Sequence, residues 1–332
     1  MIPKLLYSLQ KYTTYCDRFA ILAAFRYDLC MKKILTTILL LAVVVGGISF
    51  AVRRNTNVQT TDGKLRVVAS FYPLYDFAKN VGGNKIDVSN VTPAGAEPHD
   101  FEPSAKVLAQ AQKSDVFIYN GGQLEPWTAG FLHDFAGISV KSSAGISLQT
   151  TNDSGQKVLD PHFWLDPVLA QKIVNNIRDG LTKADPSDKS YFAKNAMVYN
   201  AQLAELDGEF RAGLAVCQTR QIITSHAAFG YLGKRYGLDV SSIAGITPDQ
   251  EPSASKLAEL AQLVKSKNIH YVFFESLVSP RLADTIAAET GAKTLAFDPL
   301  EGLSDADQKQ GKNYISVQRQ NLANLRTAGD CR

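Results

Sequence analysis

The sequence predicts an α/β fold in which two similar parallel-sheet domains are joined by a long rigid backbone helix. From residue 60 onward, short β-branched runs alternate with helical patterns, which is typical of parallel sheets built from βα units. The order of these runs repeats in the second half of the chain. Between the halves lies one amphipathic pattern of about 28 residues, enough for a helix of about 42 Å.

The first half contains four predicted strands that alternate with helices. The strands cover residues 65–71, 86–93, 115–122 and about 138–144. The helices cover residues 73–83, 104–114 and about 126–135. Glycines end the first helix, and Ser104 is placed to cap the second.

The second half repeats this order. Its predicted strands cover residues 221–225, 238–245, 269–276 and 292–300, and its helices cover residues 227–237, 252–267 and 280–291. The string "IDVSN" at Ile86 matches "LDVSS" at Leu238, and "EPSAKVLAQAQ" at Glu102 matches "EPSASKLAELAQ" at Glu251. Two matches in the same order at nearly one spacing predict a duplicated domain.

The connecting pattern begins at Pro186 and spaces its apolar residues by three and four positions. We therefore expect a stiff helix that spans both domains. The predicted organisation is a linker at 55–64, an N-terminal α/β domain at 65–185, the connecting helix at 186–215 and a C-terminal α/β domain at 216–332.

The N-terminus reads as a targeting sequence. Residues 31–54 have a positive start and an apolar core followed by small residues, as in a signal peptide. Residues 34–52 are also long enough to remain as an uncleaved membrane anchor. Because a complete signal peptide begins at Met31, translation starts either at Met31, so that residues 1–30 are not part of the protein, or at Met1, so that they form a real N-terminal extension. In both cases we expect an exported protein, periplasmic or at the cell surface.

The charge distribution argues against nucleic acid as a partner. The first 54 residues hold eight Lys and Arg against two Asp, a local charge of +6 within a chain of net charge +3. The remaining residues therefore sum to −3. The folded body has no basic surplus of the kind that binds a phosphate backbone.

Two of the four cysteines, Cys16 and Cys30, precede or lie in the leader. The other two, Cys217 and Cys331, form an even pair in an exported domain, which indicates a disulfide. The alternative is two free buried thiols.

Three of the five histidines fall just past predicted strand ends. His99 lies in "PAGAEPHDFEPS", His162 in "DPHFWLDP", and His226 directly after the strand "QIITS"; Asp298, in "AFDPL", ends the last strand. The carboxyl edge of a parallel sheet is where ligands bind, so two facing sheets would bring these four residues together across a cleft.

Three imidazoles and one carboxylate suit a tetrahedral Zn²⁺ ion. Glu275 ends the strand "HYVFFES" and is a candidate extra ligand or hydrogen-bond partner of a ligand. The alternative for each histidine alone is an ordinary hydrogen-bonding role, which we assign to His133 and His270.

Several motifs, taken in order, resemble the metal-binding subunits of ABC importers, the ZnuA/TroA-like solute-binding proteins. They include "VVASFYPLYDFAKNVGG", "PAGAEPHDFEPS", "DPHFWLDP", "IITSHAAFGYLGKRYGL", "VFFESLVSP" and "AFDPL". The resemblance covers residues 65–332. It implies two α/β domains, a backbone helix and a buried metal, with ligands at His99, His162, His226 and Asp298. The Cys217 and Cys331 contexts also resemble a cysteine pairing of part of the family.

The histidine count favours zinc over manganese. Manganese members of the family place a carboxylate where His226 stands, and an added oxygen donor suits the harder ion. Many zinc members carry a His-rich loop before the second histidine, but the corresponding stretch here, residues 148–160, has no histidine.

The expected function is capture of a divalent metal ion outside the cytoplasm and its delivery to an ABC transporter membrane permease. The expected ion is Zn²⁺, and Mn²⁺ is the alternative. We expect a monomer without enzymatic activity. The alternatives are a manganese or iron member, a surface adhesin on the same fold, and a secreted zinc hydrolase. The absence of HExxH and GxSxG motifs disfavours the hydrolase.

Overall fold

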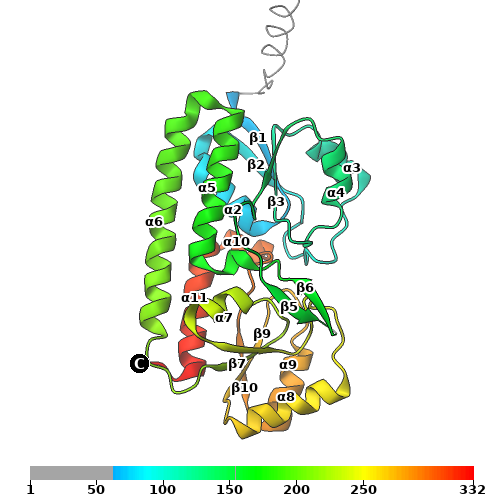
Figure 1. Cartoon of the computed structure of the whole chain (residues 1–332), viewed down its shortest axis with the longest axis vertical. Helices are drawn as coiled ribbons and strands as arrows, with labels where there is room; N and C mark the ends of the chain where they lie inside the picture. The colour runs from blue at the N-terminus through cyan, green and yellow to red at the C-terminus, as the bar shows by residue number, and fades with distance from the viewer. Residues whose placement is uncertain (1–62, 154) are drawn as a thin grey trace, which may run out of the picture. The chain divides into compact units, whose positions relative to one another are not determined.

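The computed structural model describes residues 63–153 and 155–332 as a parallel α/β structure, which confirms the predicted class (Figure 1). The predicted extension, the leader and all but the last two residues of the linker lie outside the described residues. In the described part of the chain, no helix combines the length and apolar character needed to cross a bilayer.

The first half forms a four-stranded parallel sheet in the order β2-β1-β3-β4. The strands are β1 (Leu65–Ala69), β2 (Ile86–Asn90), β3 (Val116–Tyr119) and β4 (Ile138–Lys141). The helices between them are α2 (Tyr72–Gly82), α3 (Ala105–Ala111) and α4 (Thr128–His133), and the 3₁₀ turn η2 (Gly83–Lys85) follows α2. Because each connection crosses over, all four strands end at the same edge of the sheet.

In the second half the four strands form two two-stranded parallel sheets that lie side by side. β7 pairs in parallel with β8, β9 pairs in parallel with β10, and β7 packs beside β9. The strands are β7 (Gln221–Thr224), β8 (Asp239–Ser242), β9 (Tyr271–Phe274) and β10 (Lys293–Ala296). The helices are α7 (Gly230–Tyr236), α8 (Ala254–Ser266) and α9 (Arg281–Thr290). The order β8-β7-β9-β10 matches β2-β1-β3-β4, as a duplication predicts.

Three longer helices flank the sheets (Figure 1). They are α5 (Pro167–Ala184), α6 (Lys189–Gly213) and α11 (Tyr314–Gly329). The connecting helix was expected from residue 186, but Pro186–Asp188 form the 3₁₀ turn η4, so α6 has 25 residues and a length of about 37 Å. It packs against α5, α2 and α11. Helices α5 and α11 were not predicted.

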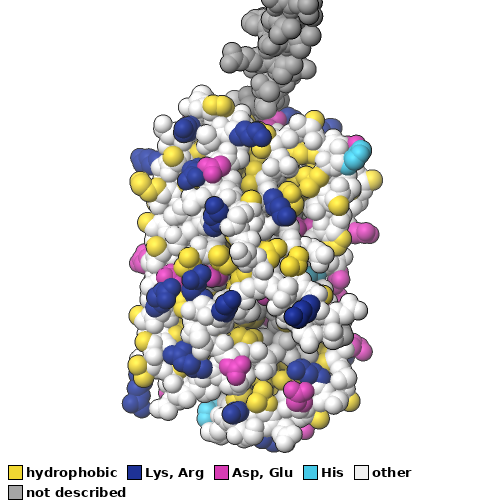
Figure 2. Space-filling view, viewed as in Figure 1, with side chains coloured by type: hydrophobic (Ala, Val, Ile, Leu, Met, Phe, Trp, Pro, Cys, Tyr) yellow, Lys and Arg dark blue, Asp and Glu magenta, His cyan; other side chains and the backbone are white. Residues whose placement is uncertain are grey.

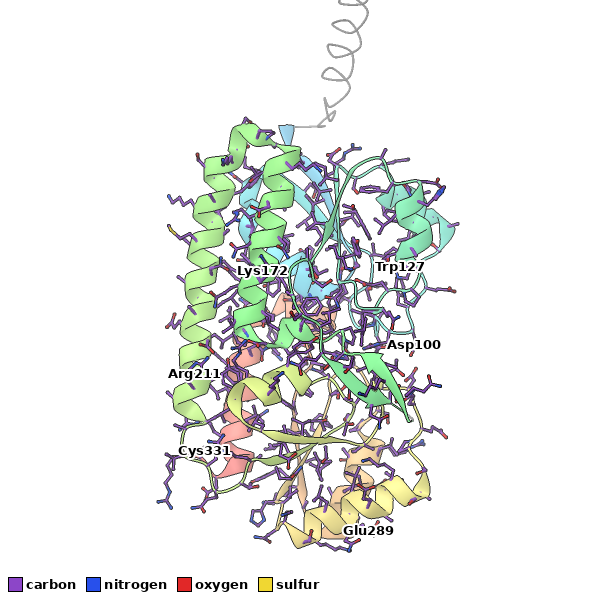
Figure 3. All side chains as sticks on the ribbon, viewed as in Figure 1. Asp100, Trp127, Lys172, Arg211, Glu289 and Cys331 are labelled. Atoms are coloured by element: carbon purple, nitrogen blue, oxygen red, sulfur yellow. A yellow bond between two sulfur atoms is a disulfide. The ribbon has the colours of Figure 1, made fainter. Side chains whose placement is uncertain are left out.

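Smaller elements complete the chain. They are the antiparallel hairpin of β5 (Thr150–Asp153) and β6 (Gln156–Leu159), the 3₁₀ turn η3 (Phe163–Leu165), and α10 (Asp305–Lys309). A disulfide joins Cys217 to Cys331, as predicted, and ties the end of α11 to the segment before β7 (Figure 3).

Charged side chains are dispersed over the surface seen in Figure 2. Lys and Arg occur from the top to the bottom of this face, and several lie near one another across its middle.

Candidate metal centre

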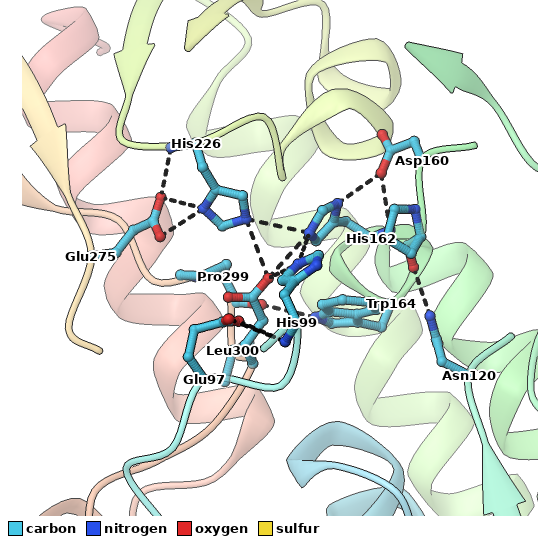
Figure 4. A network of polar contacts seen from close by, with 12 residues as sticks. Glu97, His99, Asn120, Asp160, His162, Trp164, His226, Glu275, Pro299 and Leu300 are labelled. Carbon is cyan, nitrogen blue, oxygen red and sulfur yellow. Dashed lines mark hydrogen bonds and ion pairs between the residues drawn. The ribbon is translucent and has the colours of Figure 1, made fainter. Parts of the chain in front are cut away.

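Four side chains from four separate loops converge between the two sheets (Figure 4). His99 lies in the loop between β2 and α3, His162 precedes η3, His226 follows β7 by two residues, and Glu301 follows β10 by five. Their ligand atoms all lie within 4.8 Å of one another. The three predicted histidines are thus brought together as expected from their positions at strand ends.

Five of the six distances between the donor atoms lie between 3.1 and 3.3 Å, and the sixth, from His99 Nε2 to His226 Nε2, is at most 4.8 Å. His162 Nε2 lies 3.1 Å from His99 Nε2 and 3.3 Å from His226 Nε2. Glu301 Oε1 lies 3.2 Å from His99 Nε2, 3.1 Å from His162 Nε2 and 3.2 Å from His226 Nε2. In a regular tetrahedron with edges near 3.2 Å the centre lies about 2.0 Å from each corner, which is the usual Zn–N and Zn–O distance.

Carboxylates on the outer side of two rings set the direction of their lone pairs. Asp160 Oδ1 accepts from His162 Nδ1 at 2.8 Å, and Glu275 Oε2 accepts from His226 Nδ1 at 2.7 Å. Since ionised carboxylates only accept, Nδ1 carries the proton in both rings and Nε2 is free to bind a metal. Glu275 is therefore a partner of a ligand and stands outside the group of four.

His99 is held differently. Its backbone N–H donates to both carboxylate oxygens of Glu97, at 3.2 and 3.1 Å, and its side chain is 5% exposed. Burial lowers the pKa of His99, which favours the neutral, metal-binding form of the ring. His162 and His226 have fully buried side chains, so His99 is the most exposed of the three histidines in the group.

Glu301 supplies the charge of the site. Burial acts to raise its pKa, but His226, His162 and His99 together hold the pKa of Glu301 well below its usual value. Burial likewise acts to lower the pKa of His226, whereas Glu275 and Glu301 raise it well above its usual value. Both effects describe a centre that favours positive charge, which a divalent cation supplies.

Asp298, the predicted fourth ligand, is not part of the group. The Ser276 hydroxyl donates to its Oδ2, and the Leu300 N–H donates to its Oδ1 at 2.7 Å. Leu300 has a left-handed φ of 59°, and this turn redirects the chain so that Glu301 reaches the histidines. The sequence pattern favoured Asp298, the carboxylate nearer the end of the strand, over Glu301, although both residues lie in "AFDPLE".

The other two histidines lie away from the site. His133 is exposed and pairs with Asp134, and His270 is exposed beside Asn268. This agrees with the structural role predicted for both. Within the described residues, the group of His99, His162, His226 and Glu301 is the one set of three or more metal-binding side chains that come together.

Comparison with known proteins gives a consistent result. The family model described as "Zinc-uptake complex component A periplasmic" matches residues 67–328. The high-affinity zinc uptake system protein ZnuA of Bacillus subtilis is 42% identical over 277 residues, which cover 79% of this chain and 87% of that protein. The zinc-binding lipoprotein AdcA of Streptococcus pneumoniae is 40% identical over 289 residues, 83% of this chain but only 58% of AdcA.

Solved structures agree with these sequence matches. The Zn(II)-bound ZnuA-like domain of Streptococcus pneumoniae AdcA superposes with a TM-score of 0.72 at 41% identity, over 81% of this chain and 100% of that domain. The chain therefore spans the whole ZnuA-like domain and about three fifths of the longer AdcA.

Proposed function

This chain belongs to the family of periplasmic component A of zinc-uptake complexes, and from this premise we propose that it captures Zn²⁺ outside the cytoplasm and delivers it to an ABC-type importer. His99, His162, His226 and Glu301 are the ligands, so Glu301 takes the place that sequence reasoning gave to Asp298. The observation that carries the proposal is the cluster of three imidazole nitrogens and one carboxylate oxygen, in which Glu301 Oε1 lies within 3.2 Å of all three nitrogens. Manganese, which prefers six oxygen-rich ligands, fits this donor set less well.

The residues of the site divide the work of binding. A bound ion would displace the protons from Nε2, so that three neutral imidazoles hold it, and ionised Glu301 would lower its net charge. Asp160 and Glu275 hold two rings in the correct tautomer from outside the coordination sphere. The fourth position belongs to a protein carboxylate instead of a water, which disfavours the secreted-hydrolase alternative because catalytic zinc keeps an open position.

Delivery and location extend the same proposal. The ion passes from this chain to the membrane permease of the importer, and the chain acts as a monomeric carrier outside the cytoplasm. We also propose the domain organisation expected from the sequence, with α6 as the stiff connector between residues 65–185 and 216–332. Residues 34–52 either tether the protein to the membrane or are removed on export; N-terminal sequencing of the exported protein distinguishes the two outcomes.

Zinc titration of ligand variants tests the site. We expect Ala in place of His99, His162, His226 or Glu301 to weaken Zn²⁺ binding by about 70- to 900-fold, because each removes about a quarter of a binding free energy of about 10 to 16 kcal/mol. A competition titration against a chromogenic chelator measures this range. His133→Ala, at an exposed histidine, serves as the matched control and should bind as the wild type does.

A second pair of variants separates the two carboxylates. Glu301→Gln should lose more than 100-fold in affinity, whereas Asp298→Asn should lose less than tenfold, since it acts only through the turn. The reverse ranking would return Asp298 to the ligand set and exclude Glu301.

A further inference from the structure

A buried polar chain leads from the first sheet to the His162 loop without including any metal ligand. It consists of Ser70, Glu125 and Asn120, and it ends at the carbonyl of Pro161, the residue before His162. All three side chains belong to residues that are at most 5% exposed. Neither the ligand set nor the ring-orienting carboxylates account for this chain.

Glu125 holds together an unusual loop. Gly121, Gly122 and Gln123 have consecutive left-handed φ angles of 77°, 69° and 73°. Glu125 closes this loop by accepting from the Asn120 N–H at 2.7 Å and from the Gly121 N–H at 3.2 Å, while the Ser70 hydroxyl donates to it at 2.5 Å. A left-handed glutamine costs conformational energy, so the loop depends on such bonds to keep its shape.

The loop at residues 120–125, closed in this way, orients the Asn120 side-chain amide toward the loop that contains His162. The Ser142 hydroxyl donates to Asn120 Oδ1 at 3.3 Å, which leaves Asn120 Nδ2 to donate to the Pro161 carbonyl at 2.9 Å. The loop also packs against this residue, because a Cβ on Gly122 would lie 3.5 Å from Pro161 Cα. Proline has no N–H, so its carbonyl is the main backbone group by which the segment before His162 can be held.

We propose that Asn120, oriented by Glu125, is a positioning residue for the metal ligand His162. The Asn120 amide fixes the Pro161–His162 peptide, and this places the imidazole at the corner of the tetrahedron that the ion requires. The inference rests on the proposed zinc-binding function. Asn120 follows β3 as Glu275 follows the equivalent strand β9, so the duplicated position serves the site in both halves.

The test compares Asn120→Ala with Asn195→Ala. Asn195 also donates from a side-chain amide to a backbone carbonyl, that of Val81 at 3.0 Å, but this bond joins α6 to the C-terminal end of α2 and involves no residue of the buried chain. Three quantities are measured on each full-length variant: Zn²⁺ affinity by chelator competition, the visible spectrum of the Co²⁺-loaded protein, and urea unfolding of the metal-free protein.

We expect Asn120→Ala to bind Zn²⁺ about tenfold more weakly and to show altered Co²⁺ ligand-field bands, because a displaced imidazole distorts the tetrahedron. Asn195→Ala also loses a side-chain amide bond but should keep the wild-type affinity and spectrum. An Asn120→Ala protein with wild-type affinity and spectrum would reduce this chain to a purely structural role and overturn the proposal.

Glu125→Gln keeps the inference testable if Asn120→Ala does not fold. The glutamine amide has one acceptor oxygen where the carboxylate has two, so the Asn120–Gly121 segment loses a bond and we expect about threefold weaker Zn²⁺ binding with a shifted Co²⁺ spectrum. An unchanged spectrum and affinity would contradict the proposal. A wild type that binds neither ion would overturn the proposed function and this inference together, whereas a binding wild type with unaffected variants refutes the inference alone.

Discussion

His162 and His226 make the same pair of hydrogen bonds, but the carboxylates that accept them come from different parts of the fold. In each case one carboxylate accepts from both the Nδ1–H and the backbone N–H of the histidine: Asp160 for His162, at 2.8 and 2.9 Å, and Glu275 for His226, at 2.8 and 3.1 Å. Asp160 lies two residues before its histidine in the same loop. Glu275 lies 49 residues away, at the end of the neighbouring strand β9.

This difference decides what else each histidine needs. Glu275 is anchored in a strand, so it fixes the ring of His226 and the position of its loop at once. Asp160 moves with the loop of His162 and can fix only the tautomer. The position of that loop therefore comes from elsewhere, through hydrogen bonds from Tyr231 to the Asp160 carbonyl and from Asn120 to the Pro161 carbonyl.

Of these two carboxylates, Glu275 should give the larger effect when it is substituted, as in Glu275→Gln. The glutamine oxygen can replace Oε1, but the second acceptor Oε2, which lies 2.7 Å from His226 Nδ1, becomes an NH₂ group, and the neutral side chain no longer polarises the ring. We expect a Zn²⁺ affinity about 100-fold lower, at the upper end for partners of metal ligands. Competition titration measures it. A loss below threefold would show that the strand-anchored carboxylate does not control His226.

A smaller effect should follow from Asp160→Asn. Asparagine retains Oδ1, the atom that accepts both bonds from His162, so the main loss is the negative charge behind the ring. We expect about tenfold weaker Zn²⁺ binding in the same titration. If Asp160→Asn weakens binding more than Glu275→Gln does, then a carboxylate at a strand end supports its histidine no better than one in the same loop. The proposed difference between His162 and His226 would then be wrong.

The sequence predicted one part of this arrangement well and another part poorly. Alternation of apolar runs located all eight strands of the parallel sheets, and the predicted strand ends pointed to His99 and His226; His162 follows the hairpin of β5 and β6, which was not predicted. These are properties of short stretches of chain. Glu301 was missed because its position depends on a left-handed turn at Leu300, a residue type that gives no signal for such a turn.

Helices α5 and α11 were missed although each has a start signal. Asp166 before Pro167 caps α5, and Asn313 with Ser316 forms a capping box at α11. Long-range pairs such as His226 with Glu275 and Asn120 with Pro161 have no signature in one sequence, since their partners are set by packing of distant elements.

Glu125, which orients Asn120, should also make the stability of the metal-free protein depend on pH. Burial raises the pKa of Glu125 to about 7, above the value of about 4.3 expected in the unfolded chain. Between these values the folded state binds more protons than the unfolded state, so this residue makes stability fall as pH rises from about 4.3 through about 7.

Glu125→Gln removes that titration. The free energy of unfolding of the wild type minus that of Glu125→Gln should therefore fall by at most about 1.4 kcal/mol per pH unit in this window and stay constant above it. Asp76 and Asp298, whose pKa values burial raises to about 6, titrate in both proteins and cancel in the difference. Urea unfolding with a chelator present measures it; a flat difference would mean that Glu125 keeps an ordinary pKa and bears no burial cost.

The smallest effect should come from Tyr231→Phe, which tests the second hold on the His162 loop. The Tyr231 hydroxyl donates to the Asp160 carbonyl at 3.0 Å and accepts from the Gln149 N–H at 2.7 Å, so it ties α7 to the segment before the histidine. Removing it should cost about 1 kcal/mol of stability in urea unfolding. Zn²⁺ affinity should fall less than threefold, because the Asn120 bond to Pro161 remains.

Combining Tyr231→Phe with Asn120→Ala should then weaken Zn²⁺ binding by more than the product of the two single effects, since each hydrogen bond compensates for loss of the other. Strict additivity would mean that the two bonds act on independent parts of the loop, and His162 would be positioned by Asn120 alone.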